Sequence, residues 1–244
     1  MRLRPLWLLI LVSIPLASQQ NSSLPGNETL VYNIDWRLFN AGKARVQWQP
    51  QRGGYQVNLH VESTGFVSRL FKVDDDYSAI LNSAACAESV HLTTHEGSRE
   101  RETRITFDGN SHRASYLERD LIRNSVMAQH ESEIPPCVHD VVSGLFFMRT
   151  LNLEPGQSTT VPVSDGKKTV MAKVEAQARE DLKTPEGTSH TIRYEVYLFN
   201  NVLFRRSAHL NVWMTDDRRK LPVQIRVRMT FTVGTITLQL EKQE

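Results

Sequence analysis

Aspartates and histidines are the side chains of this sequence that could hold a metal ion or carry protons in catalysis. Aspartates are consecutive at 74–76 and at 216–217. A Ca²⁺ site needs several oxygen ligands, but neither run has the D-x-[DN]-x-[DN]-G spacing of a calcium loop, and aspartate is common in turns between strands. We therefore interpret both runs as turns or strand ends and predict no metal site.

The eight histidines are scattered, and only His91 and His95 are four residues apart. That spacing would bring two ligands together on a helix, but the surrounding Val-His-Leu-Thr sequence is typical of a strand, in which such residues lie about 13 Å apart. Glu96 follows His95, yet the H-E-x-x-H motif is absent. The histidines therefore do not predict a zinc hydrolase.

Sequence motifs for nucleophilic catalysis and for nucleotide binding are missing. The chain has no G-x-S-x-G elbow, no Gly-rich phosphate loop and no dinucleotide fingerprint. Ser143 precedes Gly144 inside a predicted helix, so we interpret it as a small residue where that helix packs closely. We expect no catalytic residues, no enzymatic activity and no cofactor; a hydrolase that uses Asp216 and Asp217 or a histidine is the remaining enzyme alternative.

The N-terminus has the pattern of a signal peptide. Basic Arg2 and Arg4 precede an apolar run over 6–16, and small residues follow at Ala17 and Ser18. The run is shorter than the roughly 20 apolar residues of a membrane span. We predict a signal peptide over 1–18 with cleavage near Ala17 or Ser18, no lipid anchor because no cysteine follows, and a periplasmic or secreted mature protein.

The remaining chain is formally neutral and has no second apolar run of membrane-spanning length. Without Arg2 and Arg4, Lys+Arg falls from 29 to 27, which equals the 27 Asp+Glu. A neutral chain has no basic face for nucleic acid, so we expect no nucleic-acid partner. We predict a flexible segment over 19–27 and a single β-rich domain over 28–244.

Two cysteines, Cys86 and Cys137, follow the signal peptide. In an oxidising compartment an even pair is typical of a disulfide. This bridge would close a loop of about 50 residues and stabilise the fold by roughly 3 to 4 kcal/mol. A reactive thiol pair is the alternative, but the C-x-x-C spacing is absent.

Alternation of apolar and polar residues predicts half-buried strands through most of the chain. Turn sequences separate the segments, as at 185–187, 200–201, 216–217 and Gly234, which predicts an antiparallel meander of roughly a dozen strands. The alternating apolar sets are Leu30, Tyr32, Ile34, Trp36 and Leu38; Val57, Leu59 and Val61; Ile105 and Phe107; Ile192, Tyr194, Val196 and Leu198; Ala208, Leu210, Val212 and Met214; Val223, Ile225, Val227 and Met229; and Ile236, Leu238 and Leu240.

One segment has helical spacing. Apolar residues recur between 138 and 148, Asp140 lies near the start, and Pro155-Gly156 lies beyond the end. The pattern predicts one amphipathic helix of about three turns over 139–151, whose apolar face must pack on the sheet because no second helix is predicted.

The predicted fold class is all-β: an antiparallel meander curled into a half-barrel or open barrel, with the short helix in its hollow. Accumulated strand twist would bend so long a meander. A two-sheet sandwich is the alternative. A curled sheet would present a concave apolar surface suited to a lipid or other apolar ligand. The aromatic residues predicted to line it are Trp36, Phe146, Phe147 and Trp213.

Four ordered motifs occur along nearly the whole chain: LVYNIDW followed by NAG at 30–36 and 40–42, DVVSGLFFMR at 140–149, LEPGQ at 153–157 and VWMTDDRRKLPV at 212–223. Together they resemble the domain of unknown function 3108 family. The resemblance implies an exported bacterial envelope protein without an assigned activity. The predicted curved sheet with a helix in its hollow is also similar to the periplasmic lipoprotein carriers.

Two functions besides catalysis fit the sequence. In the first, the protein binds or carries an apolar ligand such as a lipid between sheet and helix. In the second, it is an assembly or interaction module that contacts an envelope protein and holds no small ligand. An apolar cavity and copurifying lipid would favour the first function, whereas a filled core and an exposed strand edge would favour the second.

Overall fold

The structure is a computed structural model that describes residues 24, 26–185, 187–230 and 234–244. The predicted signal peptide over 1–18 lies outside these residues, as does most of the predicted flexible segment over 19–27.

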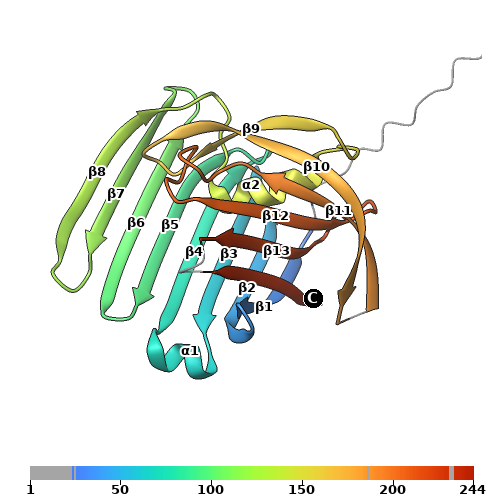
Figure 1. The fold of residues 1–244 in the computed structure, drawn as a ribbon. Helices are drawn as coiled ribbons and strands as arrows, with labels where there is room; N and C mark the ends of the chain where they lie inside the picture. Colours follow the sequence, from blue (N-terminus) through green and yellow to red (C-terminus); the bar gives the residue numbers. More distant parts are fainter. Residues whose placement is uncertain (1–23, 25, 186, 231–233) are drawn as a thin grey trace, which may run out of the picture.

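The described residues form fourteen strands that belong to one antiparallel sheet (Figure 1). This confirms the predicted all-β class. The strands are β1 Glu28–Trp36, β2 Phe39–Gln51, β3 Gly54–Ser63, β4 Val73–Asn82, β5 Ala87–Glu96, β6 Arg99–Asp108, β7 Arg113–Asp120, β8 Ser125–Glu133, β9 Ser158–Ser164, β10 Thr169–Thr184, β11 Gly187–Val196, β12 Ala208–Thr215, β13 Pro222–Met229 and β14 Thr235–Gln243.

The first and last strands are neighbours in the middle of the sheet. Its order is β8-β7-β6-β5-β4-β3-β2-β1-β14-β13-β12-β11-β10-β9. All neighbouring pairs except β1–β14 are consecutive in the chain, which is the predicted meander. The pairing of Tyr32 with Leu240 fixes the register of this central pair. Since β8 and β9 are edges that do not pair with each other, the barrel is open.

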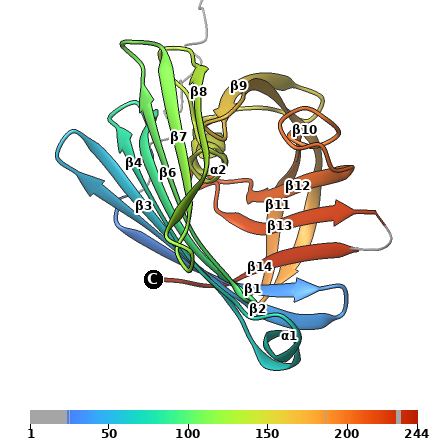
Figure 2. The same ribbon diagram turned by 90° about the vertical axis from the view of Figure 1, so that its left-hand side faces the viewer.

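The sheet curls, so that β9–β13 lie across from β2–β6 (Figures 1 and 2). The chain between edge strands β8 and β9 enters the hollow and forms α2, Val141–Phe147, and a 3₁₀ turn η1, Met148–Thr150. His139 pairs with Val163 beside edge strand β9. This extended pairing precedes Asp140, so α2 begins at Val141, and the helix ends at Phe147 because Met148–Thr150 form the 3₁₀ turn; α2 is therefore shorter than the predicted helix over 139–151.

Asp140 is the N-cap of α2, as its position predicted. Its carboxylate accepts hydrogen bonds from the backbone N–H groups of Val142 and Ser143, at 2.9 and 3.2 Å. A second short helix, α1, Gly65–Leu70, connects β3 to β4 and was not predicted. Across the described residues, no helix is long and apolar enough to cross a bilayer.

Two apolar clusters pack on opposite sides of α2. One is formed mainly by β1–β7, with Trp213, Val223 and Leu240 from β12–β14, and contains Trp48 and Phe146, whose rings stack at 5.3 Å. The other is formed by β9–β13 and contains Met148 and Val212. The interior helix therefore fills one end of the barrel and joins the two walls.

A disulfide joins Cys86, just before β5, to Cys137, just before α2, as predicted. The backbone N–H of Ala87 also donates to the Val138 carbonyl at 2.8 Å. These contacts attach the interior segment to the end of the β4–β5 hairpin.

Candidate functional site

The aspartates considered as metal ligands point to different partners. Asp74 forms an ion pair with Lys72 at 3.7 Å, and Asp75 accepts a hydrogen bond from the His95 backbone N–H at 2.9 Å. Asp76 contacts His60 at 2.9 Å. Successive side chains of a strand point to opposite faces, so the run does not converge. Among the residues with described positions, no three His, Cys, Asp or Glu side chains are placed to hold a metal ion.

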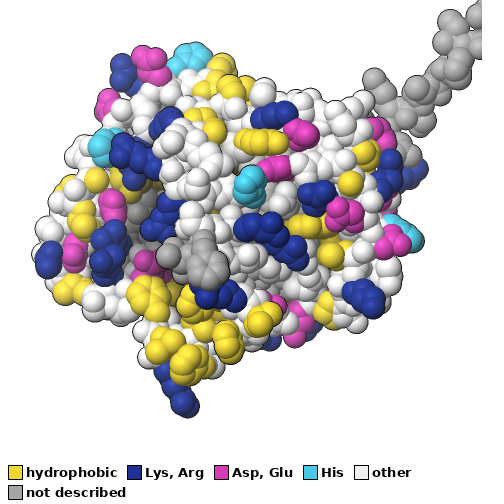
Figure 3. Space-filling view, in the orientation of Figure 1, with side chains coloured by type: hydrophobic (Ala, Val, Ile, Leu, Met, Phe, Trp, Pro, Cys, Tyr) yellow, Lys and Arg dark blue, Asp and Glu magenta, His cyan; other side chains and the backbone are white. Residues whose placement is uncertain are grey.

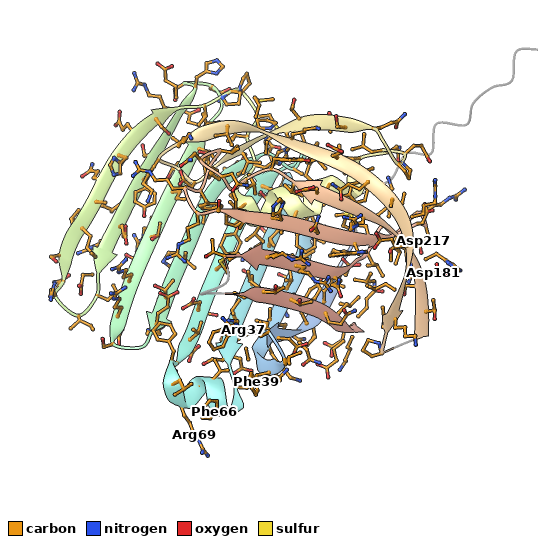
Figure 4. The ribbon with its side chains drawn as sticks, in the orientation of Figure 1. Arg37, Phe39, Phe66, Arg69, Asp181 and Asp217 are labelled. Carbon is orange, nitrogen blue, oxygen red and sulfur yellow. A yellow bond between two sulfur atoms is a disulfide. The ribbon has the colours of Figure 1, made fainter. Side chains whose placement is uncertain are left out.

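In the second aspartate pair and in the histidine pair, each side chain likewise contacts a different partner. Asp216 pairs with Arg179 at 2.8 Å, whereas Asp217 pairs with Arg219 at 3.0 Å. Asp217 lies at the right-hand edge of the molecule in Figure 4, near Asp181. His91 contacts Glu102 at 3.0 Å, and His95 Nδ1 contacts the Asp74 carbonyl at 3.1 Å.

Ser143 is buried and belongs to the cap of α2. Its hydroxyl donates to the Asp140 carboxylate and accepts from the Asp140 backbone N–H at 3.1 Å. The Tyr77 hydroxyl donates to the same carboxylate at 2.5 Å, and burial together with this carboxylate raises the pKa of Tyr77. This buried group orients the interior helix against β4.

The structure separates the four aromatic residues predicted to line a ligand site. Phe146 is buried against Trp48, and Phe147 stacks on His139 at 4.2 Å, so both rings fill the core around α2. Trp36 is half-buried at the end of β1, on the inner face of the sheet, where it pairs with Ile236. It lies at the open end of the barrel.

Trp213 lies on the other face of the sheet. It follows inner-face Val212 and pairs with Gln224. Its indole N–H donates to Glu180 at 2.8 Å, and the Arg226 guanidinium lies 5.0 Å from its ring. The depression around it, about 400 Å³, is lined mainly by charged and polar residues. Trp213 is itself buried and belongs to the same apolar cluster as Phe146, so it is a core residue rather than part of an open surface.

A buried ion pair at the end of the interior segment was missed by sequence reasoning. Arg149 donates through both terminal nitrogens to the Glu28 carboxylate, and the two side chains are 4% and 7% exposed. Glu28 and Arg149 are 121 positions apart, and no local pattern links them. The pair connects η1, which contains Arg149, to β1, which begins at Glu28.

A strip of partly buried apolar residues lies on the inner face of β1, β14 and β13. It consists of two rows that cross these strands, and we call it the inner strip. One row pairs Ile34 with Leu238 and Leu238 with Ile225; the other pairs Trp36 with Ile236 and Ile236 with Val227. All six side chains are half-buried, although they face the inside of the curled sheet.

The inner strip begins where the filling by α2 ends. Towards α2, the next inner-face residues on β1 and β14, Tyr32 and Leu240, are buried. Across β2, inner-face Leu59 and Val61 of β3 are again half-buried and apolar. Asp75 pairs with Val61, and burial raises the pKa of its carboxyl group. The open end thus has an apolar floor with an acidic group at its side.

The geometry defines the chain as an open, curled antiparallel β-barrel with a helical segment inside. It belongs to the family described as protein of unknown function (DUF3108), whose model matches residues 31–241. No curated protein matches the sequence significantly.

Solved structures resemble this fold at low sequence identity. A β-barrel-like protein of domain of unknown function DUF1849 from Brucella abortus has a TM-score of 0.57 and 7% identity, over 90% of this chain and 97% of that chain. A DUF1089 family protein from Pseudomonas aeruginosa has a TM-score of 0.36 and 11% identity, over 77% and 90% of the two chains. A protein with a YmcC-like fold from Bacteroides fragilis has a TM-score of 0.33 and 10% identity, over 90% and 96%. The first likeness supports the barrel-like fold.

Proposed function

We propose that this protein is an exported envelope protein that holds an apolar ligand, such as the acyl chain of a lipid, against the inner strip. The observation that carries the proposal is the burial pattern: the six strip residues face inward in a curled sheet, yet each is only partly buried, at the margin of the two apolar clusters. Apolar side chains on an inner face are normally covered by other side chains. An acyl chain laid along the strip would cover them.

The size and shape of the strip suit a flexible apolar chain. The two rows each cross three strands, and neighbouring strands are about 4.8 Å apart, so each row spans roughly 10 Å. Leu59 and Val61 extend the apolar surface on the other side of β2. No residue in the two rows is charged, and the charged groups nearest to them, Asp75 and the Arg37 guanidinium 5.8 Å from the Trp36 ring, lie at the margins of the strip.

The disulfide supports the proposed location. Such bonds form and persist mainly in oxidising compartments, which include the bacterial periplasm and the exterior of the cell. An exported protein beside a membrane would encounter lipids as apolar ligands.

A ligand titration with strip variants tests the proposal. The probe is cis-parinaric acid, a fatty acid that fluoresces when it enters an apolar site. Ile236→Trp would fill the strip with a larger ring, and we expect it to weaken probe binding about tenfold or more, since pocket shape sets the fit of an apolar ligand. The matched control is Thr237→Trp on the same strand, whose residue pairs with Asp35 on the opposite face.

Two results would contradict the proposal. Wild-type protein that leaves the probe non-fluorescent has no open apolar site, and equal binding by Ile236→Trp and Thr237→Trp places the probe elsewhere. Thermal unfolding of each variant checks that the substitution has not disrupted the sheet.

The second candidate function is contact with an envelope protein through edge strand β8. In the described structure, β8 pairs only with β7, so its outer edge has unpaired backbone groups on which another strand could be added. Most of its side chains are exposed. Protection of β8 amides from hydrogen exchange by an envelope extract, without bound lipid, would favour this function over ligand binding.

A further inference from the structure

Exposed apolar side chains gather at one end of the barrel. Ten large apolar residues are exposed among those described, and nine lie in or near the connections that follow β1, β3 and β7. The tenth is Met171 on β10. The nine are Leu38, Phe39, Phe66, Leu70, Phe71, Leu121, Ile122, Val126 and Met127.

These connections lie at the same end because the strands are antiparallel and consecutive. In β1–β8, the connections after β1, β3, β5 and β7 all emerge at one end of the sheet, and those after β2, β4 and β6 emerge at the other. We call the first group the apolar end. The other three connections, 52–53, 83–86 and 109–112, contain no exposed large apolar residue.

The most prominent part of the apolar end is formed by α1 and the β1–β2 turn. The Thr64 backbone N–H donates to the Ala41 carbonyl at 2.9 Å, and its hydroxyl donates to Asn40 at 3.1 Å. These bonds hold Phe66 next to Phe39, and both lie with Arg69 at the lower tip (Figure 4). The space-filling view shows apolar side chains covering this tip beside a Lys or Arg side chain (Figure 3).

The connections of the apolar end are basic. Residues 37–38, 64–72, 97–98 and 121–124 contain Arg37, Arg69, Lys72 and Arg123, and no Asp or Glu. Lys72 forms an exposed ion pair with Asp74 at 3.7 Å. The neighbouring acidic residues lie within the strands rather than in the connections: Asp35, Glu62, Asp74, Glu96, Glu100 and Asp120.

We propose that the apolar end docks on the surface of a membrane that contains anionic phospholipid. Exposed Phe and Leu side chains beside Arg and Lys are suited to the interface, where apolar groups enter the acyl boundary and cations meet phosphate groups. The apolar residues lie in or beside three separate connections between strands, which can each enter a fluid bilayer. A protein partner would need a matching groove for each of them.

Docking in this way directs the inner strip to the membrane. Trp36 of the strip immediately precedes Arg37 and Leu38 of the β1–β2 turn, so the strip opens at the apolar end. The docking proposal stands on the exposed residues and their charge, and it does not require the ligand. Vesicle binding and probe binding are therefore separate measurements.

Vesicle flotation tests the docking proposal. The protein is mixed with vesicles of phosphatidylcholine and phosphatidylglycerol, or of phosphatidylcholine alone. We expect wild-type protein to float with the anionic vesicles and high salt to weaken this binding. The double variants Phe66→Ser/Leu70→Ser and Leu38→Ser/Phe39→Ser should each reduce binding about tenfold, because binding scales with the apolar area inserted.

The controls separate insertion from general hydrophobicity and from charge. Met171→Ser removes a side chain that is 58% exposed, similar to the 66% of Phe66, but outside the apolar end, and should bind like wild type. Arg69→Gln should reduce binding to anionic vesicles about fivefold, since one basic residue near such a surface contributes about 1 kcal/mol.

Three results would overturn the docking proposal. The first is wild-type protein that does not bind anionic vesicles. The second is tip variants that float as well as wild type. Crosslinking of the tip to an envelope protein, with no vesicle binding, would assign the apolar end to a protein partner instead.

Discussion

Arg149 and Glu28 form a buried ion pair that connects the interior segment to the first strand of the sheet. Arg149 also donates to the Arg219 carbonyl, at 2.9 and 3.1 Å, and Gln243 donates to Glu28 at 2.9 Å. The pair thus joins η1, β1, the β12–β13 connection and β14. Its charges are paired and hydrogen-bonded, as burial of ions requires.

Removing one member of this pair should strongly destabilise the protein. Arg149→Met leaves the Glu28 carboxylate buried without its cation, which costs about 3–5 kcal/mol of unfolding free energy. Urea unfolding followed by tryptophan fluorescence measures the change. The double variant Glu28→Leu/Arg149→Met should recover part of the loss, and a loss below about 1 kcal/mol in Arg149→Met would show that the pair contributes little.

The disulfide should contribute substantially to stability. Cys86 and Cys137 are 51 positions apart, and closing a loop of that length stabilises the fold by about 4 kcal/mol in the chain-entropy estimate. Cys86→Ala/Cys137→Ala should lower the urea midpoint accordingly, and a reducing agent should lower that of wild type by a similar amount. A midpoint that neither treatment changes would show that the fold does not depend on the bridge.

His139 should make stability depend on pH in the mildly acidic range. Burial lowers the pKa of its imidazole, and Nδ1 donates to the Ala85 carbonyl at 2.9 Å. The unfolded state, with the ordinary pKa of about 6.5, therefore binds the proton more readily than the folded state. The stabilisation is complete above that pKa and is lost as the pH falls below it.

Urea midpoints at neutral and mildly acidic pH measure this dependence. His139→Asn keeps a donor near the Ala85 carbonyl and removes the titrating group, so its midpoint should fall less on acidification than that of wild type. Parallel curves for the two proteins would assign the pH dependence to other groups.

Much of the sheet was predictable because alternation in one strand is a local property. The run from Leu30 to Trp36 alternates in sequence, and β1 covers these residues. The alternation also predicted that Leu38 belongs to this strand and is buried, which is wrong. Strand β1 ends at Trp36, and Leu38 is 95% exposed in the turn that follows. Its exposure depends on where the strand ends, which alternation does not encode.

The interior helix was recognisable from its spacing, but its length was not. Val138 and His139 fit the helical pattern, yet His139 pairs with Val163, and Val138 accepts a hydrogen bond from Ala87. These partners are distant in sequence. Helix α1 is six residues long and contains no buried residue. Phe66, Val67 and Leu70 have helical spacing, but so short a segment offers too few positions to recognise a helix.

The candidate site could be predicted only in part. Trp36 has an inner-face position beside Ile236, whereas Trp213 points to the other face and Phe146 fills the core. The difference depends on register and on how far α2 fills the barrel. Both follow from pairings between residues far apart in the sequence, so aromatic composition alone did not separate these roles.

Native mass spectrometry of the mature protein, purified from an envelope fraction and followed by solvent extraction, tests ligand binding at the inner strip most directly. The account predicts a bound lipid in one-to-one ratio with wild type, retained in Thr237→Trp and lost or much reduced in Ile236→Trp. A ligand-free mass for wild type, together with no thermal stabilisation when fatty acid or phospholipid is added, would contradict it.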